Sequence, residues 1–363
     1  MNIVKMITKL TGTTALTAAT FMAVTGVGVT GAIAQEFDCS ELTGASVVHF
    51  QGPYTKQLAM GAQAAVEECG GTYRSAGPAA FDTAAEVAAF QDMVLAGADA
   101  IVVVAFPSDF WIRPIDEAVN SGVVVSTFDV ESPSSLASLH TAPKQKDQGV
   151  MMADVIADEL DPDVSGTIVT GICLPGLALI EARVTGFDQR IAERLPNVEV
   201  IGAFDVKFDQ TQNFSAWRSV YDANQGALAY VGFCENDLPS LVRLKESTGE
   251  DFEIASIGIN PDGLDGIERG VALAAVGQKP FMQGYVAMRA MLQNIAAGTS
   301  VPRGWIDVGP ELVTFDNVAE ITAREETVSA GYEDIRAFYA NDIEMIFDDL
   351  PGSVQSFSDL LAQ

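Results

Sequence analysis

Polar side chains that can form several hydrogen bonds at once stand at the ends of short apolar runs in this sequence. Asp129 directly follows the run at 123–128, and Asn236 and Asn260 follow two later runs. A carboxylate accepts several hydrogen bonds, and an amide both accepts and donates them. Because ligands of open α/β sheets bind at the carboxyl ends of the strands, this placement indicates a site for a small polar ligand.

Each candidate also has a purely structural interpretation. Asp129 could be an ordinary turn residue after a strand, and Arg183 could be a solvated helix residue paired with a nearby acid. Asn236 or Asp237 could cap the helix that follows them, and we expect one of the two to do so. Gln278 could be an ordinary loop amide.

Motifs of the common enzyme classes are missing from the sequence. There is no G-x-S-x-G nucleophile elbow, no phosphate-binding loop and no His-Glu metal helix, and only His49 and His140 could act as imidazole bases. The G-x-G-x-x-G match at 26–31 lies inside an expected signal peptide, so it carries no weight. We therefore expect a binding protein without catalytic residues, metal or cofactor.

The amino-terminal segment resembles a cleaved export signal. Lys5 and Lys9 precede an apolar stretch, and the small residues at 32–34 fit a cleavage site, so residues 1–34 are expected to be removed. The net charge of −29 would repel nucleic acid and anionic lipid. We expect a free, monomeric, exported protein.

The four cysteines allow three pairings in an oxidising compartment. Cys39 lies just before the first predicted strand and Cys69 ends the first predicted helix, which favours a disulfide between them. Cys173 and Cys234 each end a later strand, and spacing alone leaves their state open.

From residue 45 onward, short apolar runs alternate with stretches of helical periodicity. The runs at 45–50, 100–105 and 123–128 form a first series of predicted parallel strands, and runs near 167–171, 198–204, 227–233 and 253–258 form a second. The length left after the signal exceeds one ordinary domain. The sequence therefore predicts two α/β lobes with a ligand cleft between them.

Six segments, in this order, resemble the ribose-binding protein group: VVAFPSD (103–109), VVSTFD (124–129), RVTGF (183–187), CEND (234–237), SIGINPD (256–262) and VGQKP (276–280). That group comprises periplasmic sugar-binding proteins of ABC transporters with the type I fold. The similarity runs from about residue 45 to 305.

The resemblance implies two Rossmann-like, doubly wound lobes joined by a hinge of three chain crossings, with the ligand cleft between them. The crossings would fall near 141–144, 278–280 and 303–306. The implied division is a signal peptide at 1–34, a first lobe of 43–142 plus 279–304, and a second lobe of 143–278 plus 305–363.

The resemblance also implies ligand contacts at polar and aromatic positions, which here are Tyr54, Asp129, Arg183, Phe208, Asn236, Asn260 and Gln278. Vicinal hydroxyls suit such donors and acceptors, and rings pack against the C–H faces of a sugar. The chain departs from the family at Val130, where an Arg is usual, and at Asn260, where an Asp is usual. We therefore expect another pentose, a hexose or a polyol rather than ribose.

On this interpretation the chain is the periplasmic substrate-binding component of an ABC importer, and its partner is an ABC permease. A sensory module that docks on a chemoreceptor or sensor kinase is the alternative, and an exported hydrolase using Asp129 and Asp237 is a weaker one. His49 could reach the cleft or be an ordinary core histidine, and Phe106 is expected to fill the core.

Overall fold

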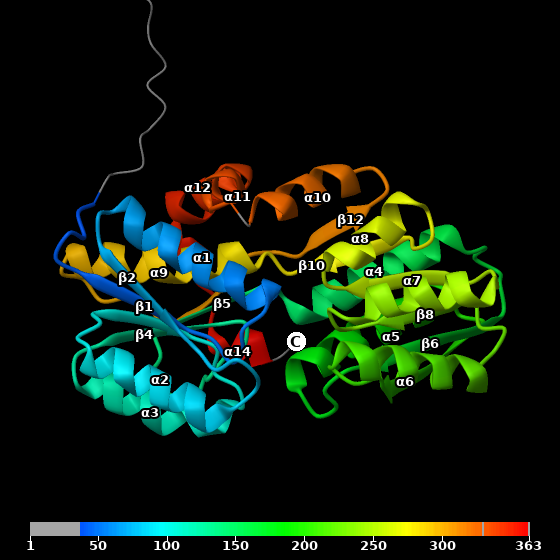
Figure 1. Ribbon diagram of the computed structural model, residues 1–363, viewed down its shortest axis with the longest axis horizontal. Helices are drawn as coiled ribbons and strands as arrows, with labels where there is room; N and C mark the ends of the chain where they lie inside the picture. The colour runs from blue at the N-terminus through cyan, green and yellow to red at the C-terminus, as the bar shows by residue number, and fades with distance from the viewer. Residues whose placement is uncertain (1–36, 329, 362–363) are drawn as a thin grey trace, which may run out of the picture. The chain divides into compact units, whose positions relative to one another are not determined.

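The computed structural model describes residues 37–328 and 330–361, and the expected signal peptide lies outside them. Strands and helices alternate along this part of the chain and form two six-stranded sheets, each with helices on both faces (Figure 1). The predicted α/β class with two doubly wound lobes is confirmed.

The first sheet has the order β11-β5-β4-β3-β1-β2, and its paired strands are parallel. Its strands are β1 (Thr43–Val47), β2 (Thr72–Ala76), β3 (Ala100–Val103), β4 (Val124–Phe128), β5 (Leu139–Ala142) and β11 (Gly304–Asp307). Helices α1 (Pro53–Glu68) and α9 (Pro280–Ala296) cover one face, and α2 (Thr83–Leu95) and α3 (Ser108–Asn120) cover the other.

The second sheet repeats this plan with the order β12-β10-β9-β8-β6-β7, in which only the pairing of β12 with β10 is antiparallel among the described strands. Its strands are β6 (Gly166–Ile172), β7 (Val198–Asp205), β8 (Ala229–Gly232), β9 (Glu253–Ile257), β10 (Ala274–Gly277) and β12 (Glu311–Thr314). Its helices are α4 (Gln145–Glu159), α5 (Ala178–Arg194), α6 (Gln210–Ala223), α7 (Asp237–Thr248), α8 (Pro261–Glu268) and α10 (Val318–Thr327).

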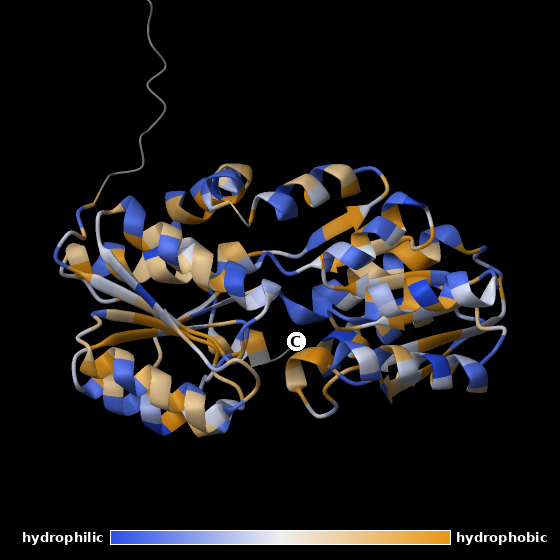
Figure 2. Cartoon of the chain, in the orientation of Figure 1, coloured by the Kyte–Doolittle hydropathy of each residue, from blue (hydrophilic) through white to orange (hydrophobic). Residues whose placement is uncertain are grey.

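Local sequence explains where these elements form. All four residues of β3 are buried, as expected of a parallel strand covered on both faces, and the strands in the middle of the first sheet are hydrophobic in Figure 2. Helix α1 begins at Pro53, which suits the first helical turn. Helix α2 begins after Asp82, whose carboxylate accepts a hydrogen bond from the backbone of Ala85.

Glycines allow one pair of helices in each lobe to pack backbone against backbone. A side chain at Gly61 or Gly284 would collide with the partner helix of the α1–α9 pair. A side chain at Gly149 would collide with the carbonyl of Arg183, in the α4–α5 pair. The close approach of α4 and α5 therefore fixes the position of Arg183 on α5 relative to α4.

The chain crosses between the lobes after β5, after β10 and again between β11 and β12. The third crossing, at 308–310, follows the predicted segment at 303–306, because β11 pairs with β5 in the first sheet and buries Trp305. The assignment of residues 305 onward to the second lobe was therefore wrong for β11. It was also wrong for the carboxyl-terminal helices at 333–361, which pack on the first lobe. The remaining lobe boundaries stay predictions.

The carboxyl-terminal helices also return to the first lobe. These are α11 (Glu333–Phe338), α12 (Ala340–Asp348), α13 (Leu350–Ser353) and α14 (Phe357–Leu361). Ile335, Tyr339, Ile343 and Leu350 join the same hydrophobic core as α1 and α9. Within the described chain, this segment makes a fourth crossing between α10 and α11, which the predicted three-crossing hinge lacks.

A buried guanidinium ties this fourth crossing together. The Arg324 side chain is 3% exposed. It donates to both carboxylate oxygens of Glu311 at 2.8 Å, to Glu325 at 2.8 Å and to the Tyr339 hydroxyl at 2.7 Å. Glu325 in turn accepts a hydrogen bond from Gln57 of α1. Strand β12 of the second lobe is thus linked to helices that pack on the first.

We expect Arg324→Ala to lower the free energy of unfolding by about 3–5 kcal/mol, because it leaves buried carboxylates without a partner. Urea unfolding would measure the loss. Arg113→Ala is the matched control, since the Arg113–Glu117 pair is on the surface and should contribute at most about 1 kcal/mol. Equal losses in the two variants would show that the buried cluster does not hold the segment.

Candidate functional site

A cavity of about 310 Å³ lies at the carboxyl ends of strands from both sheets. It falls within the size range of small-molecule sites. All seven residues predicted to contact a ligand line it: Tyr54, Asp129, Arg183, Phe208, Asn236, Asn260 and Gln278. The structure thus brings the whole predicted set together, and the role of each residue toward a ligand remains a prediction.

Asp129 follows β4 in the left-handed region, with φ 62°, a conformation that Asp and Asn adopt more readily than most residues. Its backbone N–H donates to Gln283 Oε1 at 2.9 Å, and its carboxylate accepts from the Tyr54 hydroxyl at 2.9 Å. Burial raises the pKa of Asp129 to about 6, against the opposing effects of the Tyr54 hydrogen bond and the Arg183 charge.

Arg183 reaches the cavity from α5 and is 3% exposed. Its guanidinium donates to Gln145 Oε1 at 2.8 Å, to the carbonyl of Phe233 at 3.0 Å and to Gln278 Oε1 at 2.7 Å. Burial lowers its pKa to about 10, so the side chain stays charged at neutral pH. These three partners are all uncharged, and a guanidinium has five N–H groups, so donor capacity is left toward the cavity.

Gln283 lies in α9 and was not among the site residues predicted from the sequence. It is fully buried in α9, and its amide donates to the Tyr54 hydroxyl at 3.2 Å and to the carbonyl of Gln278 at 2.8 Å. It therefore joins Asp129 and Tyr54 of the first lobe to the crossing that carries Gln278. A polar residue within an apolar helix face was the only signal in the sequence.

Glu235 is a second lining residue that the sequence reasoning missed. It lies between Cys234 and Asn236, in a segment singled out for its asparagine. Burial raises the pKa of its carboxyl to about 7, helped by the negative charges of Glu325 and Asp129 and opposed by Arg183. Among the described residues no hydrogen-bond partner of this carboxylate is found, so it is free to accept one from a ligand.

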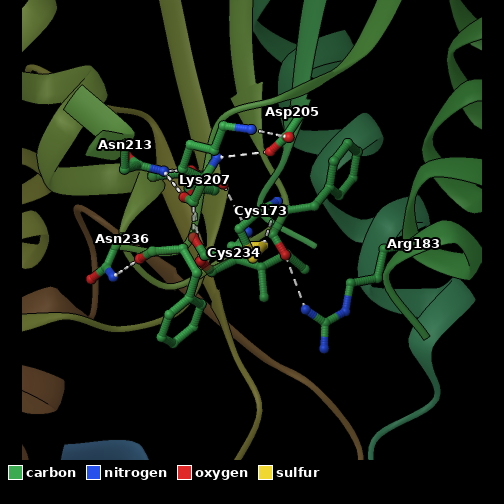
Figure 3. Close-up of a disulfide and its surroundings, with 12 residues drawn as sticks. Cys173, Arg183, Asp205, Lys207, Asn213, Cys234 and Asn236 are labelled. Carbon is green, nitrogen blue, oxygen red and sulfur yellow. Dashed lines mark hydrogen bonds and ion pairs between the residues drawn. A yellow bond between two sulfur atoms is a disulfide. The ribbon is translucent and has the colours of Figure 1, made fainter. Parts of the chain in front are cut away.

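A disulfide between Cys173 and Cys234 ties the ends of β6 and β8 beside the cavity (Figure 3). Its Cα atoms are 6.1 Å apart. The sequence left these two cysteines open, and the structure also pairs Cys39 with Cys69. The bridge fixes the loop that carries Glu235 and Asn236, the latter donating to the carbonyl of Phe208 at 2.7 Å.

The expectation that the side chain of Asn236 or Asp237 caps α7 is wrong, and the cap bond is found at Asn260 instead. Asn260 caps α8 by accepting from the backbone of Asp262 at 3.1 Å. Asn236 precedes α7 without a side-chain cap bond. The buried carboxylate of Asp237 accepts from Cys234, Asn213 and Trp217 and does not line the described cavity.

Five aromatic rings line another part of the cavity wall: His49, Phe50, Phe81, Phe106 and Phe208. We call them the aromatic cluster. Phe208 was expected here, His49 had been left open between the cleft and the core, and Phe106 had been expected to fill the core. Trp111 and Trp217, in contrast, are fully buried as core residues.

Two sheets of the same doubly wound order, with a cavity at the carboxyl ends of their strands, define the class of two-lobed binding proteins. A family model described as periplasmic binding protein domain matches residues 44–300. The chain belongs to this family. A comparison with curated protein sequences finds no match.

Solved structures share the fold at low sequence identity. A glucose-galactose binding protein, GanP from Geobacillus stearothermophilus, is 18% identical with a TM-score of 0.68, over 76% of this chain and 98% of its own. A solute-binding protein of an ABC transporter from Burkholderia graminis, in complex with D-arabinose, is 20% identical with a TM-score of 0.69, over 77% and 97%. The XylFII–LytSN complex is 18% identical with a TM-score of 0.67, over 76% and 98%.

The helices of residues 37–328 and 330–361 include none that is both long and apolar enough to cross a membrane.

The raised pKa of Glu235 predicts a pH-dependent stability. Its pKa of about 7 in the folded protein, against 4.5 for an ordinary glutamate, means that the folded state binds the proton more tightly. The stability that the folded protein gains from this tighter proton binding is fully present below about pH 4.5 and is lost as the pH rises to about 7.

Glu235→Gln removes the buried ionisation. At pH 8 the free energy of unfolding of the variant should therefore be at least about 1 kcal/mol higher than that of the unchanged protein. The difference should shrink toward pH 5, and calorimetry without ligand would follow it. Glu199→Gln, at an exposed position on β7, serves as the control. A difference that stays constant from pH 5 to 8 would contradict the assigned ionisation.

Proposed function

We propose that the chain is the substrate-binding component of an ABC importer, which captures a monosaccharide or sugar alcohol between its lobes and delivers it to the permease by hinge closure. The observation that carries this proposal is the convergence of Asp129, Arg183 and Glu235 on one interlobe cavity. Family membership and the sugar ligands of proteins with the same fold support it.

The free hydrogen-bonding capacity of the cavity fits a polyhydroxylated ligand. The carboxylates of Asp129 and Glu235 can accept from hydroxyl groups, while the unused N–H groups of Arg183 can donate to them. A hydroxyl is donor and acceptor at once, so neighbouring hydroxyls can satisfy both kinds of group. A ligand with only acceptors would offer no hydrogen bond to either carboxylate.

Closure is proposed to act through the crossing at 278–279. Gln278 lies in this crossing and accepts from Arg183 at 2.7 Å, while its carbonyl accepts from Gln283 at 2.8 Å. A change in the angle between the lobes would therefore move groups that line the site. Such hinge motions around a ligand are well established for proteins built from two lobes.

Export to the periplasm through the expected signal peptide, and a monomeric state, remain part of this proposal. A sensory role is the second candidate, in which the closed form docks on a chemoreceptor or sensor kinase. The XylFII–LytSN complex favours keeping it, because it shows a protein of this fold bound to another protein. Pull-down of a membrane permease rather than a sensor by the liganded protein would decide for import.

The hydrolase alternative named Asp129 and Asp237 as a carboxylate pair. Asp237 is fully buried and does not line the described cavity. Asp129 and Asp237 therefore cannot flank a glycosidic bond there. We expect a bound sugar to be recovered chemically unchanged after prolonged incubation, which chromatography of the released ligand would show.

A panel of pentoses, hexoses and polyols in a thermal-shift assay tests the ligand class. A ligand at 100 times its Kd should stabilise the protein by about 2.7 kcal/mol. Small-angle scattering should show a smaller radius of gyration with the same ligand. Absence of any shift across the panel would overturn the carbohydrate assignment.

Asp129→Asn should weaken binding of the responding sugar at least about tenfold, a change of roughly 1.4 kcal/mol, because the charged acceptor is lost. Asn tolerates the left-handed conformation and can still accept from Tyr54, so the melting temperature without ligand should not fall. Asp109→Asn, at an exposed position on α3, is the matched control. Titration calorimetry would measure both, and unchanged affinity in Asp129→Asn would exclude Asp129 as a ligand contact.

A further inference from the structure

The cavity wall consists of two chemically different parts. Hydrogen bonds from Tyr54 to Asp129 and from Arg183 to Gln278 organise the polar part, beside Glu235. The aromatic cluster forms the other part, and its rings contact one another. Asn236 marks the boundary, because its side chain donates to the carbonyl of Phe208.

Ring contacts connect every member of the aromatic cluster. The ring centroids of His49 and Phe50 are 4.6 Å apart, those of Phe50 and Phe81 are 4.8 Å apart, and those of Phe81 and Phe208 are 5.2 Å apart. Phe106 joins through Phe81 at 6.1 Å. Phe208 follows β7 of the second lobe, whereas the other rings belong to the first, so this part of the wall is built from both lobes.

The aromatic cluster is uncharged. Burial lowers the pKa of His49 to about 3, so its imidazole is neutral at any physiological pH. Its Nδ1 is buried and has no hydrogen-bond partner among the described residues. Val130 and Leu177 also line the cavity and add to its apolar surface.

A free monosaccharide can cover only part of such a wall. Its C–H face can pack on one or two rings, but hydroxyls surround the rest of the molecule. Hydroxyls turned toward the aromatic cluster would lose water without gaining a partner, which costs free energy. A ligand with an aromatic group beside its hydroxyls would instead bury that group against the rings of the aromatic cluster.

We infer that the cavity takes a sugar joined to an aromatic group, that is, an aryl glycoside, with its hydroxyls on the polar part and its aromatic ring on the aromatic cluster. This inference rests on the proposed function and extends its ligand class from free sugars to sugars that carry an aromatic group.

A comparison of paired ligands distinguishes a failure of this inference from a failure of the proposed function. Titration calorimetry would compare free sugars, methyl glycosides and phenyl glycosides of arabinose, xylose, glucose and galactose. For the sugar that binds, the phenyl glycoside should bind at least about tenfold more tightly than the methyl glycoside. A phenyl glycoside that binds no better than its methyl counterpart would overturn the inference and leave sugar binding intact. Absence of binding by all three forms would overturn the proposed function itself.

Variants of the aromatic cluster locate the effect. Phe81→Ala is a suitable test variant, because Phe81 is 41% exposed and the loss of its ring should leave folding intact. Phe106→Ala is the second variant of the cluster. Each of the two variants should reduce the ratio of phenyl-glycoside affinity to methyl-glycoside affinity at least about fivefold. Phe110→Ala is the matched control, since Phe110 is 68% exposed on α3 and does not line the cavity. A ratio that survives both cluster variants would overturn the assignment of the ring to this wall, and melting temperatures without ligand would verify folding.

Discussion

A buried guanidinium that must keep its charge is the constraint on which the binding site depends. Arg183 is buried and stays ionised, so its N–H groups need partners. The chain supplies these from the start of α4, the end of β8 and the crossing after β10. Through Gln278, Gln283 and Tyr54 the hydrogen bonds then continue to Asp129 in the first lobe. One network therefore holds the polar groups of both lobes.

The rest of the architecture keeps this network in place. Glycine-mediated contact between α4 and α5 sets the position of Arg183, and the disulfide from Cys173 to Cys234 fixes the loop carrying Glu235. Doubly wound sheets bring these loops together because parallel strands end at one edge. The same arrangement leaves two acidic groups and one basic group around the cavity, where burial raises the pKa values of the two carboxyls and the charge of Arg183 opposes the shift.

The carboxyl-terminal segment adds a constraint that the two sheets alone would not impose. Arg324 joins β12 to Tyr339, and Lys279 of the second crossing pairs with Asp342 at 2.7 Å. Opening of the lobes would have to accommodate these contacts as well as the crossings. The segment would therefore restrain the proposed hinge closure although it lies outside the cavity lining.

The α/β class, the doubled series of strands and the strand-end position of Asp129 could be predicted from the sequence, because apolar periodicity and chain order are local properties. The sequence also showed polar residues where parallel strands must end. In contrast, the link that Gln283 makes between the lobes, the position of Glu235 at the cavity and the place of β11 in the first sheet emerge from the folded chain. These outcomes depend on contacts between residues far apart in the chain, which no local pattern encodes. The aromatic cluster is the clearest case, since Phe50, Phe81 and Phe208 come from three separate loops and become one surface only when both lobes are folded.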